Sequence, residues 1–247
     1  MKRSIITLLS VMIASLICIH AEKYEIKVGE FSELVVNDNI NVVYDNIADS
    51  VGFVRFDIEK KYASYIMVNR SKGKLKIQLD QLAMELDKLP TVYVYSSYLC
   101  KAVNAKDSTL TIRNIAPGAK IEIKQQNNGK IFVSGLEAVD LNISLETGKG
   151  LINASGKCDN LSIGNLGTGV VQADEVVAKN VRCSLLGTGT IGCNPKEALH
   201  VKGLGSGKVY YLGTPTITKA KLSNVKVISL NKEDDDEEIP EIGSSEE

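Results

Sequence analysis

The sequence predicts an all-β fold: a parallel β-helix, or β-solenoid, with coils of about 20 residues and more irregular N-terminal strands. Three observations predict it. A short glycine-containing motif recurs at nearly constant spacing, apolar residues alternate in short runs around each motif, and a helical pattern occurs only once. Units of this kind bury an apolar face only when copies stack on one another.

The recurring motif reads Leu-x-Thr/Ser-Gly. Its four clear copies end at glycines that lie 21, 20 and 18 residues apart, namely Gly148, Gly169, Gly189 and Gly207. A fainter copy ends at Gly129, and residues 107–110 form a worn copy before it. Glycine can adopt positive φ or allow close approach of another backbone, so each motif is expected to form a corner. The clear repeats cover residues 121–222.

Apolar positions recur in step with the motif. Pairs two residues apart precede the last glycine, as in Leu161 and Ile163 or Val181 and Cys183. The copy at Gly148 departs, because its apolar pair is shifted by one residue. Pairs with this spacing indicate strands with one face turned inward. We expect a ladder of corner hydroxyls and a matching inward column of leucines; their members are Thr147, Thr168, Thr188 and Ser206, and Leu166, Leu186 and Leu204.

The N-terminal half lacks the motif. Residues 24–79 and 91–95 read as strands, and the one helical candidate covers residues 81–89, before Pro90. This half is expected to form irregular first coils or to cap the stack.

The N-terminus has the order of a secretory signal peptide. Lys2 precedes an apolar run over residues 5–19, and Ala21 stands just before charged residues. The run is about 15 residues long, short of the roughly 20 that span a bilayer. We expect a signal peptide over residues 1–21, a solenoid domain over residues 22–231, and export to the periplasm, the cell surface or the medium. An uncleaved anchor is the alternative.

The C-terminal residues 232–247 carry nine acidic residues and one basic residue. A segment of this composition is expected to be a disordered tail. A tail that binds a partner or folds back on the body is the alternative. Residues 22–231 then hold 26 basic and 21 acidic residues, an excess of about +5. That excess is too small to indicate a nucleic-acid-binding protein.

The cysteines are expected to be free. Cys18 suggests lipid attachment, but Ile17 is large where lipoprotein signals carry a small residue. The others have no zinc-like or redox spacing, and they lie at unequal offsets in the repeat. We interpret them as core residues, Cys183 above all, because it shares an inward slot. These four are Cys100, Cys158, Cys183 and Cys193.

No catalytic, metal or cofactor site is expected. The single histidine of the mature chain, His200, lies between two inward positions and should point outward, so it does not serve as a triad base. Paired carboxylates could serve a polysaccharide-cleaving solenoid, but no spacing singles out a pair, and sugar-stacking aromatic residues are few. The candidate carboxylates are Asp140, Glu146, Asp159 and Asp174; the aromatic residues are Phe132, Tyr210 and Tyr211.

The strands and repeats together resemble a bacterial family described as putative auto-transporter adhesin, head GIN domain. The resemblance covers residues 31–228. It rests on the strand–Asn-Ile-Asn–strand step at residues 34–43, the Lys-Leu-Lys-Ile strand at 74–77, the Pro-Thr-Val-Tyr-Val strand at 90–94, and the Gly-x-Pro ending at 213–215. The resemblance implies a β-solenoid in a cell-envelope or secreted setting, with no catalytic residues to carry over.

Three function classes remain from the sequence. The first is a binding or adhesion module that contacts a glycan or an envelope protein through a solenoid face. The second is a structural envelope component without a discrete ligand, and the third is a polysaccharide-active enzyme. The sequence favours the first class. It identifies neither the residues that bind nor the oligomeric state.

Overall fold

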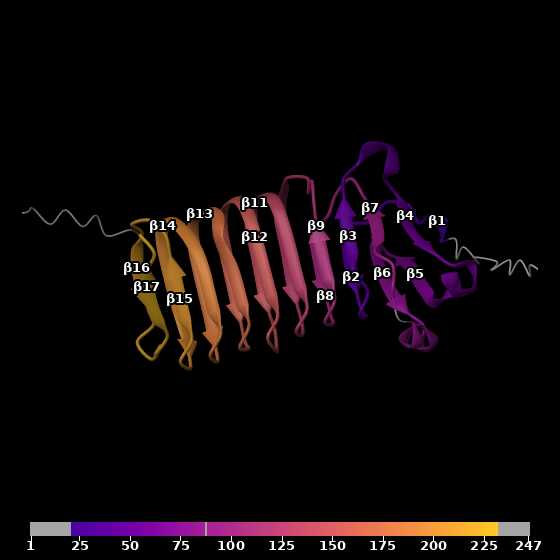
Figure 1. Ribbon diagram of the computed structural model, residues 1–247. Coiled ribbons are helices and arrows are strands. Elements are labelled where there is room, and N and C mark those ends of the chain that lie inside the picture. Colours follow the sequence, from indigo (N-terminus) through magenta and orange to yellow (C-terminus); the bar gives the residue numbers. More distant parts are fainter. Residues whose placement is uncertain (1–20, 87, 232–247) are drawn as a thin grey trace, which may run out of the picture.

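The computed structural model describes residues 21–86 and 88–231, and its strands stack into a long β-solenoid (Figure 1). All 17 strands belong to one hydrogen-bonded sheet that winds around the stack. The helices are short 3-10 turns: η1 (Ala48–Ser50), η2 (Lys60–Tyr65) and η3 (Gln81–Glu85). The predicted all-β solenoid is confirmed. The expected acidic tail, and all of the expected signal peptide except Ala21, lie outside the described residues.

Each C-terminal coil crosses the molecule twice. β10 (Gly118–Gln125) runs along one broad side, here called the first face, and after a turn the chain returns along the second face. Each of the four long strands starts on the second face, bends, and continues on the first face of the next coil. They are β11 (Lys130–Leu145), β12 (Leu151–Asn165), β13 (Val170–Leu186) and β14 (Thr190–Leu204). The last strands, all parallel, are β15 (Lys208–Tyr211), β16 (Thr216–Lys219) and β17 (Lys226–Ser229).

Chain order and stack order differ in the N-terminal half. The coil formed by residues 33–45 lies between two coils that come later in the sequence, and every pairing among these three coils is parallel. In stack order these coils are β6 (Lys74–Leu79) with β7 (Val92–Tyr95), β2 (Glu33–Val36) with β3 (Val42–Asp45), and β8 (Lys101–Asn104) with β9 (Thr109–Ile112).

Antiparallel strands close this N-terminal end. β5 (Ile66–Ser71) pairs with β6, and β4 (Phe53–Ile58) pairs with both β7 and β1 (Glu22–Lys27). Their pairing covers strand edges that would otherwise be open to other chains. The N-terminal half therefore forms both first coils and a cap.

Inward residues stack into columns because consecutive coils keep one register. One column of the first face is almost fully buried: Ile123, Ile143, Ile163, Cys183 and Val201. The next inward column holds Gln125, Leu145, Asn165 and Leu185, each 0% exposed. Polar members of this column bond to the turns. The Asn165 amide, for example, donates to the Gly169 carbonyl at 2.9 Å, which satisfies a buried polar group.

The predicted inward column of leucines is wrong. Leu166, Leu186 and Leu204 are 52%, 43% and 59% exposed. The two-residue period continues to the end of each strand, so the inward residue is Leu185 and its neighbour Leu186 points outward. Alignment of the copies on the last glycine identified the repeat. It did not continue the two-residue alternation to the end of the strand, and so the leucine at the start of each motif was predicted to point inward.

The corner ladder is confirmed for three members and corrected for one. Thr168, Thr188 and Ser206 share one register, because the strands that follow them pair Val170 with Thr190 and Thr190 with Lys208. The equivalent of Gly169 is Gly150 rather than Gly148, since a Cβ on Gly169 would lie 2.3 Å from the Gly150 carbonyl oxygen. The turn that contains Thr147 has one extra residue, which displaces that threonine.

The predicted helix over residues 81–89 is shorter than expected. Only η3 forms, and Asp80 caps it by accepting a hydrogen bond from the Leu82 N–H at 3.0 Å. Leu86 already has extended backbone angles. The chain must reach the extended strand β7 only a few residues later, which leaves no length for a longer helix.

All four cysteines of the described chain are free. Cys183 and Cys193 reach the core from the two faces of one coil. The hydrogen bond between their thiols, together with burial, raises the pKa of Cys183. The expected free thiols and the burial of Cys183 are confirmed. The unequal repeat offsets place Cys183 and Cys193 on different faces of the coil, but both side chains reach the same core and come within hydrogen-bonding distance.

Candidate binding site

His200 lies on the outer surface, as predicted. It stands between buried Leu199 and Val201 and lines a shallow hollow of about 450 Å³ on the first face. Arg182 and Lys202 line the same hollow, with small residues between them. None of the four candidate carboxylates is among the lining residues, so the hollow does not pair this imidazole with any of them.

The four candidate carboxylates do not form a single cluster. Asp140 accepts a hydrogen bond from the Asn160 amide at 3.0 Å, and Asp159 pairs with Lys179 at 2.7 Å. Glu146 pairs with Lys124 at 2.6 Å, and that hydrogen bond lowers the pKa of the carboxyl group. Glu146 is six residues beyond Asp140 along an extended strand, on the order of 20 Å away. Asp140, Glu146 and Asp159 therefore serve as partners of residues on neighbouring coils.

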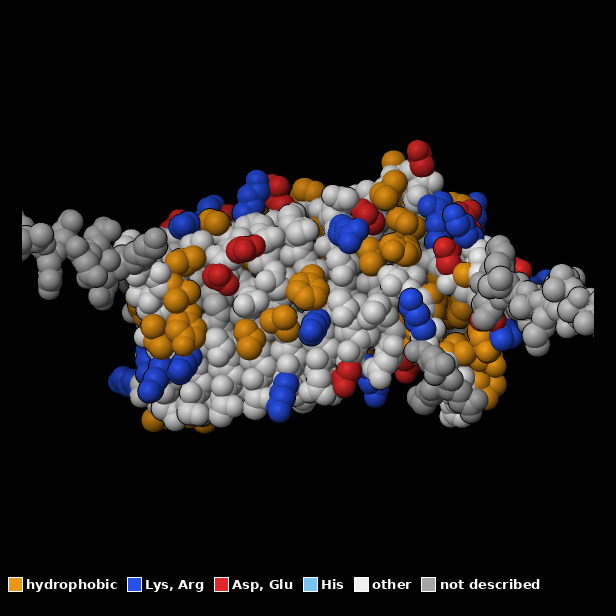
Figure 2. Space-filling model, viewed as in Figure 1, with side chains coloured by type: hydrophobic (Ala, Val, Ile, Leu, Met, Phe, Trp, Pro, Cys, Tyr) orange, Lys and Arg blue, Asp and Glu red, His pale blue; other side chains and the backbone are white. Residues whose placement is uncertain are grey.

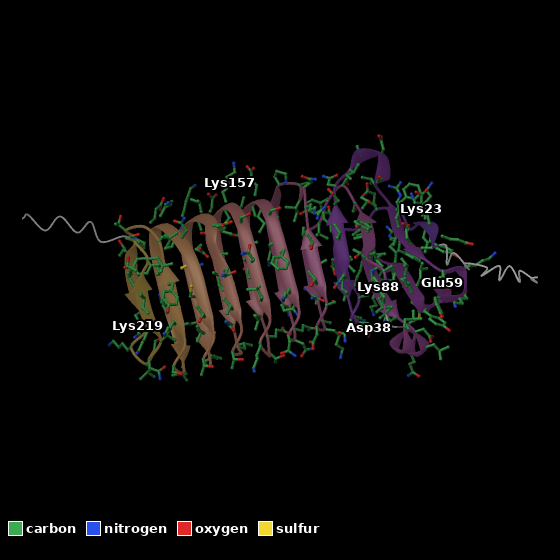
Figure 3. The ribbon with its side chains drawn as sticks, in the orientation of Figure 1. Lys23, Asp38, Glu59, Lys88, Lys157 and Lys219 are labelled. Atoms are coloured by element: carbon green, nitrogen blue, oxygen red, sulfur yellow. The ribbon has the colours of Figure 1, made fainter. Side chains whose placement is uncertain are left out.

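A larger hollow than the one beside His200 lies on the narrow side where the long strands bend from the second face to the first. It is a groove of about 710 Å³ across four coils. Its floor is a column of small residues that are paired coil to coil: Gly118, Ala138, Cys158 and Ala178. Lys157, which lines the groove, is at the top of Figure 3, on the edge opposite the turns.

Two outward columns wall the groove. Glu137, Lys157 and Val177 are paired along one wall, and Val139, Asp159 and Lys179 follow the floor residues along the other. Ion pairs tie each wall together, at 3.2 Å between Lys157 and Glu137 and 2.7 Å between Lys179 and Asp159. Val139 is 50% exposed and Val177 is 41% exposed. The walls therefore combine neutralised charges with free apolar surface.

Cys158 lies in the floor with only 8% of its surface exposed. Burial, with the nearby charges of Asp159 and Asp140, raises its pKa to about 11. A thiol with such a pKa is a weak nucleophile at neutral pH, because the thiolate is the reactive form. Cys158 thus acts as a small apolar floor residue.

The arrangement suits binding of an extended apolar segment. An apolar concavity with a few fixed polar groups is the usual form of a ligand site. No aromatic side chain lines it, so it offers no platform for sugar rings. Among the described residues, no group of three His, Cys, Asp or Glu side chains is placed to hold a metal ion.

Sequence reasoning missed this groove, although a signal for it was present. Ala138, Cys158 and Ala178 recur every 20 residues, and each is small where other outward or inward slots carry larger side chains. A column of small residues at one repeat position predicts a furrow along the stack.

Within residues 21–86 and 88–231, no helix has both the length and the apolar character needed to cross a bilayer. Solved structures with a similar fold include a putative adhesin from Bacteroides fragilis, 20% identical, which aligns over 85% of this chain and 96% of its own with a TM-score of 0.76. A putative lipid binding protein from Parabacteroides distasonis is 17% identical over 86% and 97% of the chains, with a TM-score of 0.67.

A putative adhesin from Parabacteroides merdae is 15% identical over 86% and 97% of the chains, with a TM-score of 0.65. At these identities the likeness establishes the fold alone. Comparison with curated proteins gives no match. The family described as "Putative auto-transporter adhesin, head GIN domain" matches residues 30–215, about three quarters of the sequence. The chain therefore belongs to the putative auto-transporter adhesin, head GIN domain family.

Proposed function

We propose that this protein is an exported, non-enzymatic binding module of the cell envelope, and that the groove over the Ala138–Cys158–Ala178 floor holds a segment of another envelope protein. The single observation that carries the proposal is the continuous apolar floor, flanked by half-exposed valines and by the Lys157–Glu137 and Lys179–Asp159 ion pairs. An extended peptide can place apolar side chains on such a floor while its backbone stays near the rim.

The groove supports a protein ligand more than a glycan. Sugar-binding surfaces use aromatic rings, and none lines this groove. The paired charges on each wall lower the cost of covering them, because each charge keeps its partner when water leaves. The family name and the adhesin-named neighbours are consistent with a binding role. One neighbour is named a lipid binding protein, which makes an acyl chain the alternative occupant.

Photo-crosslinking in the native host tests the proposal. A photoreactive residue replaces Val139 or Val177, which are 50% and 41% exposed and can change without loss of core packing. Both positions should yield the same discrete protein adduct. A matched probe at Tyr93, 42% exposed at the N-terminal end, should not.

A competing substitution makes the test sharper. The substitution Val177→Lys, in a chain with the probe at position 139, should abolish the adduct because it brings a charge into the apolar wall. An adduct that survives this change, or that the Tyr93 probe also gives, would contradict the proposal. An adduct with lipid instead of protein would establish the alternative occupant.

Export is tested separately. The mass of the protein purified from the envelope should correspond to a chain that begins near Glu22. A chain that retains Met1, or one with lipid on Cys18, would contradict release by signal cleavage.

A further inference from the structure

The C-terminal turns carry an exposed row of leucines that the core does not use. Leu166, Leu186, Leu204 and Leu222 are 52%, 43%, 59% and 88% exposed. Leu186 pairs directly with Leu204, and the flanking registers place the other two in the same row. We call this row the leucine edge. Contiguous exposed apolar surface on a soluble domain marks a contact site.

The leucine edge is confined to the C-terminal coils. In the two preceding turns, the equivalent positions hold Gln126 and Glu146, and Glu146 is bound by Lys124. The turn itself needs no leucine, since it forms with Gln or Glu at the same place. Packing therefore does not account for four successive leucines that point into solvent.

Unpaired positive charge surrounds the same edge. Residues 198–231 contain five lysines and no acidic residue. Lys202 and Lys221 precede the leucines of the last two turns, and Lys208 and Lys226 follow them on the second face. All four are exposed, and none forms an ion pair within the described chain. Figure 2 shows blue side chains gathered at the lower left of the molecule, over the C-terminal coils, with apolar side chains at the rim beneath them.

From these observations we infer that the leucine edge docks the protein on an anionic membrane surface. Leucine tips flanked by lysines combine the two attractions that hold peripheral proteins on bilayers, which are apolar insertion at the headgroup boundary and attraction to acidic lipid. The lysine stems add apolar length while their charges stay at the headgroups.

The shape of the edge favours a bilayer over a protein partner. Four leucines at the strand spacing form a row roughly 15 Å long and one side chain wide. Such a convex row buries too little area for a stable protein interface, whereas it can enter a deformable headgroup layer. The edge lies opposite the groove in each coil, so a membrane-docked molecule would present the groove away from the bilayer.

Vesicle co-sedimentation of the full chain tests this inference. The full chain is used so that the acidic residues 233–238, which follow these lysines in the sequence, are present in the assay. The protein should sediment with vesicles of phosphatidylcholine that contain about one third phosphatidylglycerol, and not with pure phosphatidylcholine. The Leu204→Ser, Leu222→Ser double variant should bind at least roughly tenfold more weakly.

One more variant of the edge and two matched controls separate the leucine edge from general effects of charge and hydrophobicity. Lys202→Gln, Lys208→Gln and Lys226→Gln together should also reduce binding at least roughly tenfold. The same change at three exposed lysines of the capped end, Lys23, Lys60 and Lys72, should leave binding unchanged, as should Leu82→Ser, which is 53% exposed there. Circular dichroism verifies that each variant is folded. Equal binding by wild type and the leucine variant, equal binding to neutral vesicles, or no binding to either vesicle would overturn the inference.

Discussion

Adjacent leucines in one strand provide a direct test of the coil register. Leu185 is 0% exposed, whereas Leu186 is 43% exposed. In its column, Leu185 lies next to Asn165, whose amide is tied to the turn, and next to Gly203, which has no side chain. Few atoms can therefore move into the space that a smaller residue would leave. We expect Leu185→Ala to cost about 4 kcal/mol, in the upper part of the range for buried leucines.

Leu186→Ala removes the same atoms from a site that is nearly half in water. Its expected cost is about 0.5 kcal/mol, as for surface substitutions. Urea unfolding, followed by circular dichroism, measures both variants against the wild type, and an unchanged m-value shows that the same surface unfolds in each. A difference of less than about 1 kcal/mol between the two variants, or the opposite order, would refute the register.

Three further predictions concern glycines of β12, an ion pair and the groove floor. Gly156→Ala should cost more than about 2 kcal/mol in thermal unfolding, because Gly156 has φ +144 and its new Cβ would lie 2.1 Å from the Leu136 carbonyl oxygen. Gly164→Ala should be near neutral in the same assay, because its Cβ would meet only the Ser144 Cβ at 4.0 Å. Glu146→Gln should lower the free energy of unfolding by less than about 1 kcal/mol at pH 7. Since folding lowers the pKa of Glu146, this loss of stability should disappear as the pH falls through that pKa. A loss that persists in acid would exclude the ion pair as its cause. Alkylation of Cys158 at pH 8 should be about a hundredfold slower in the folded than in the urea-unfolded chain, because its pKa is raised from 9.0 to about 11; equal rates would show an open floor.

The repeat made the architecture predictable, and local register was where prediction failed. Spacing of the glycine motif established stacked coils, and the apolar pairs such as Leu161 and Ile163 correctly identified the inward positions. The turn registers did not follow, because a one-residue insertion near Gly148 looks the same in sequence as a shifted glycine. The pairing of Leu151 with Val170 and the close approach of the Gly150 carbonyl to Gly169 distinguish the two.

The order of the N-terminal coils could not be read from sequence. β2 and β3 pair with strands on both sides that come later in the chain. Each strand has the same alternating pattern, so the pattern fixes which face turns inward but leaves the choice of neighbour open. Long-range pairing, rather than local preference, selects the neighbour.

The candidate binding surfaces were less predictable than the fold because they depend on outward residues. Inward residues carry a clear apolar signal, whereas an outward Val139 or Leu204 reads in sequence as one more core residue. The predicted outward position of His200 was correct, but it followed from its buried neighbours and revealed no partner. The groove needed the register, which brings Ala138, Cys158 and Ala178 together.

A solenoid separates the residues that hold the stack from the residues that meet partners. The groove lies at the bends in the middle of the long strands, and the leucine edge lies at the turns that follow these strands, with the buried columns between them. Val139 and Leu204 lie in different coils and share no side-chain column, so changes at the two sites should combine additively in stability. The same independence should hold for binding: loss of vesicle binding through Leu204 should leave the groove crosslink intact. Coupling between the two would mean that one partner covers both edges.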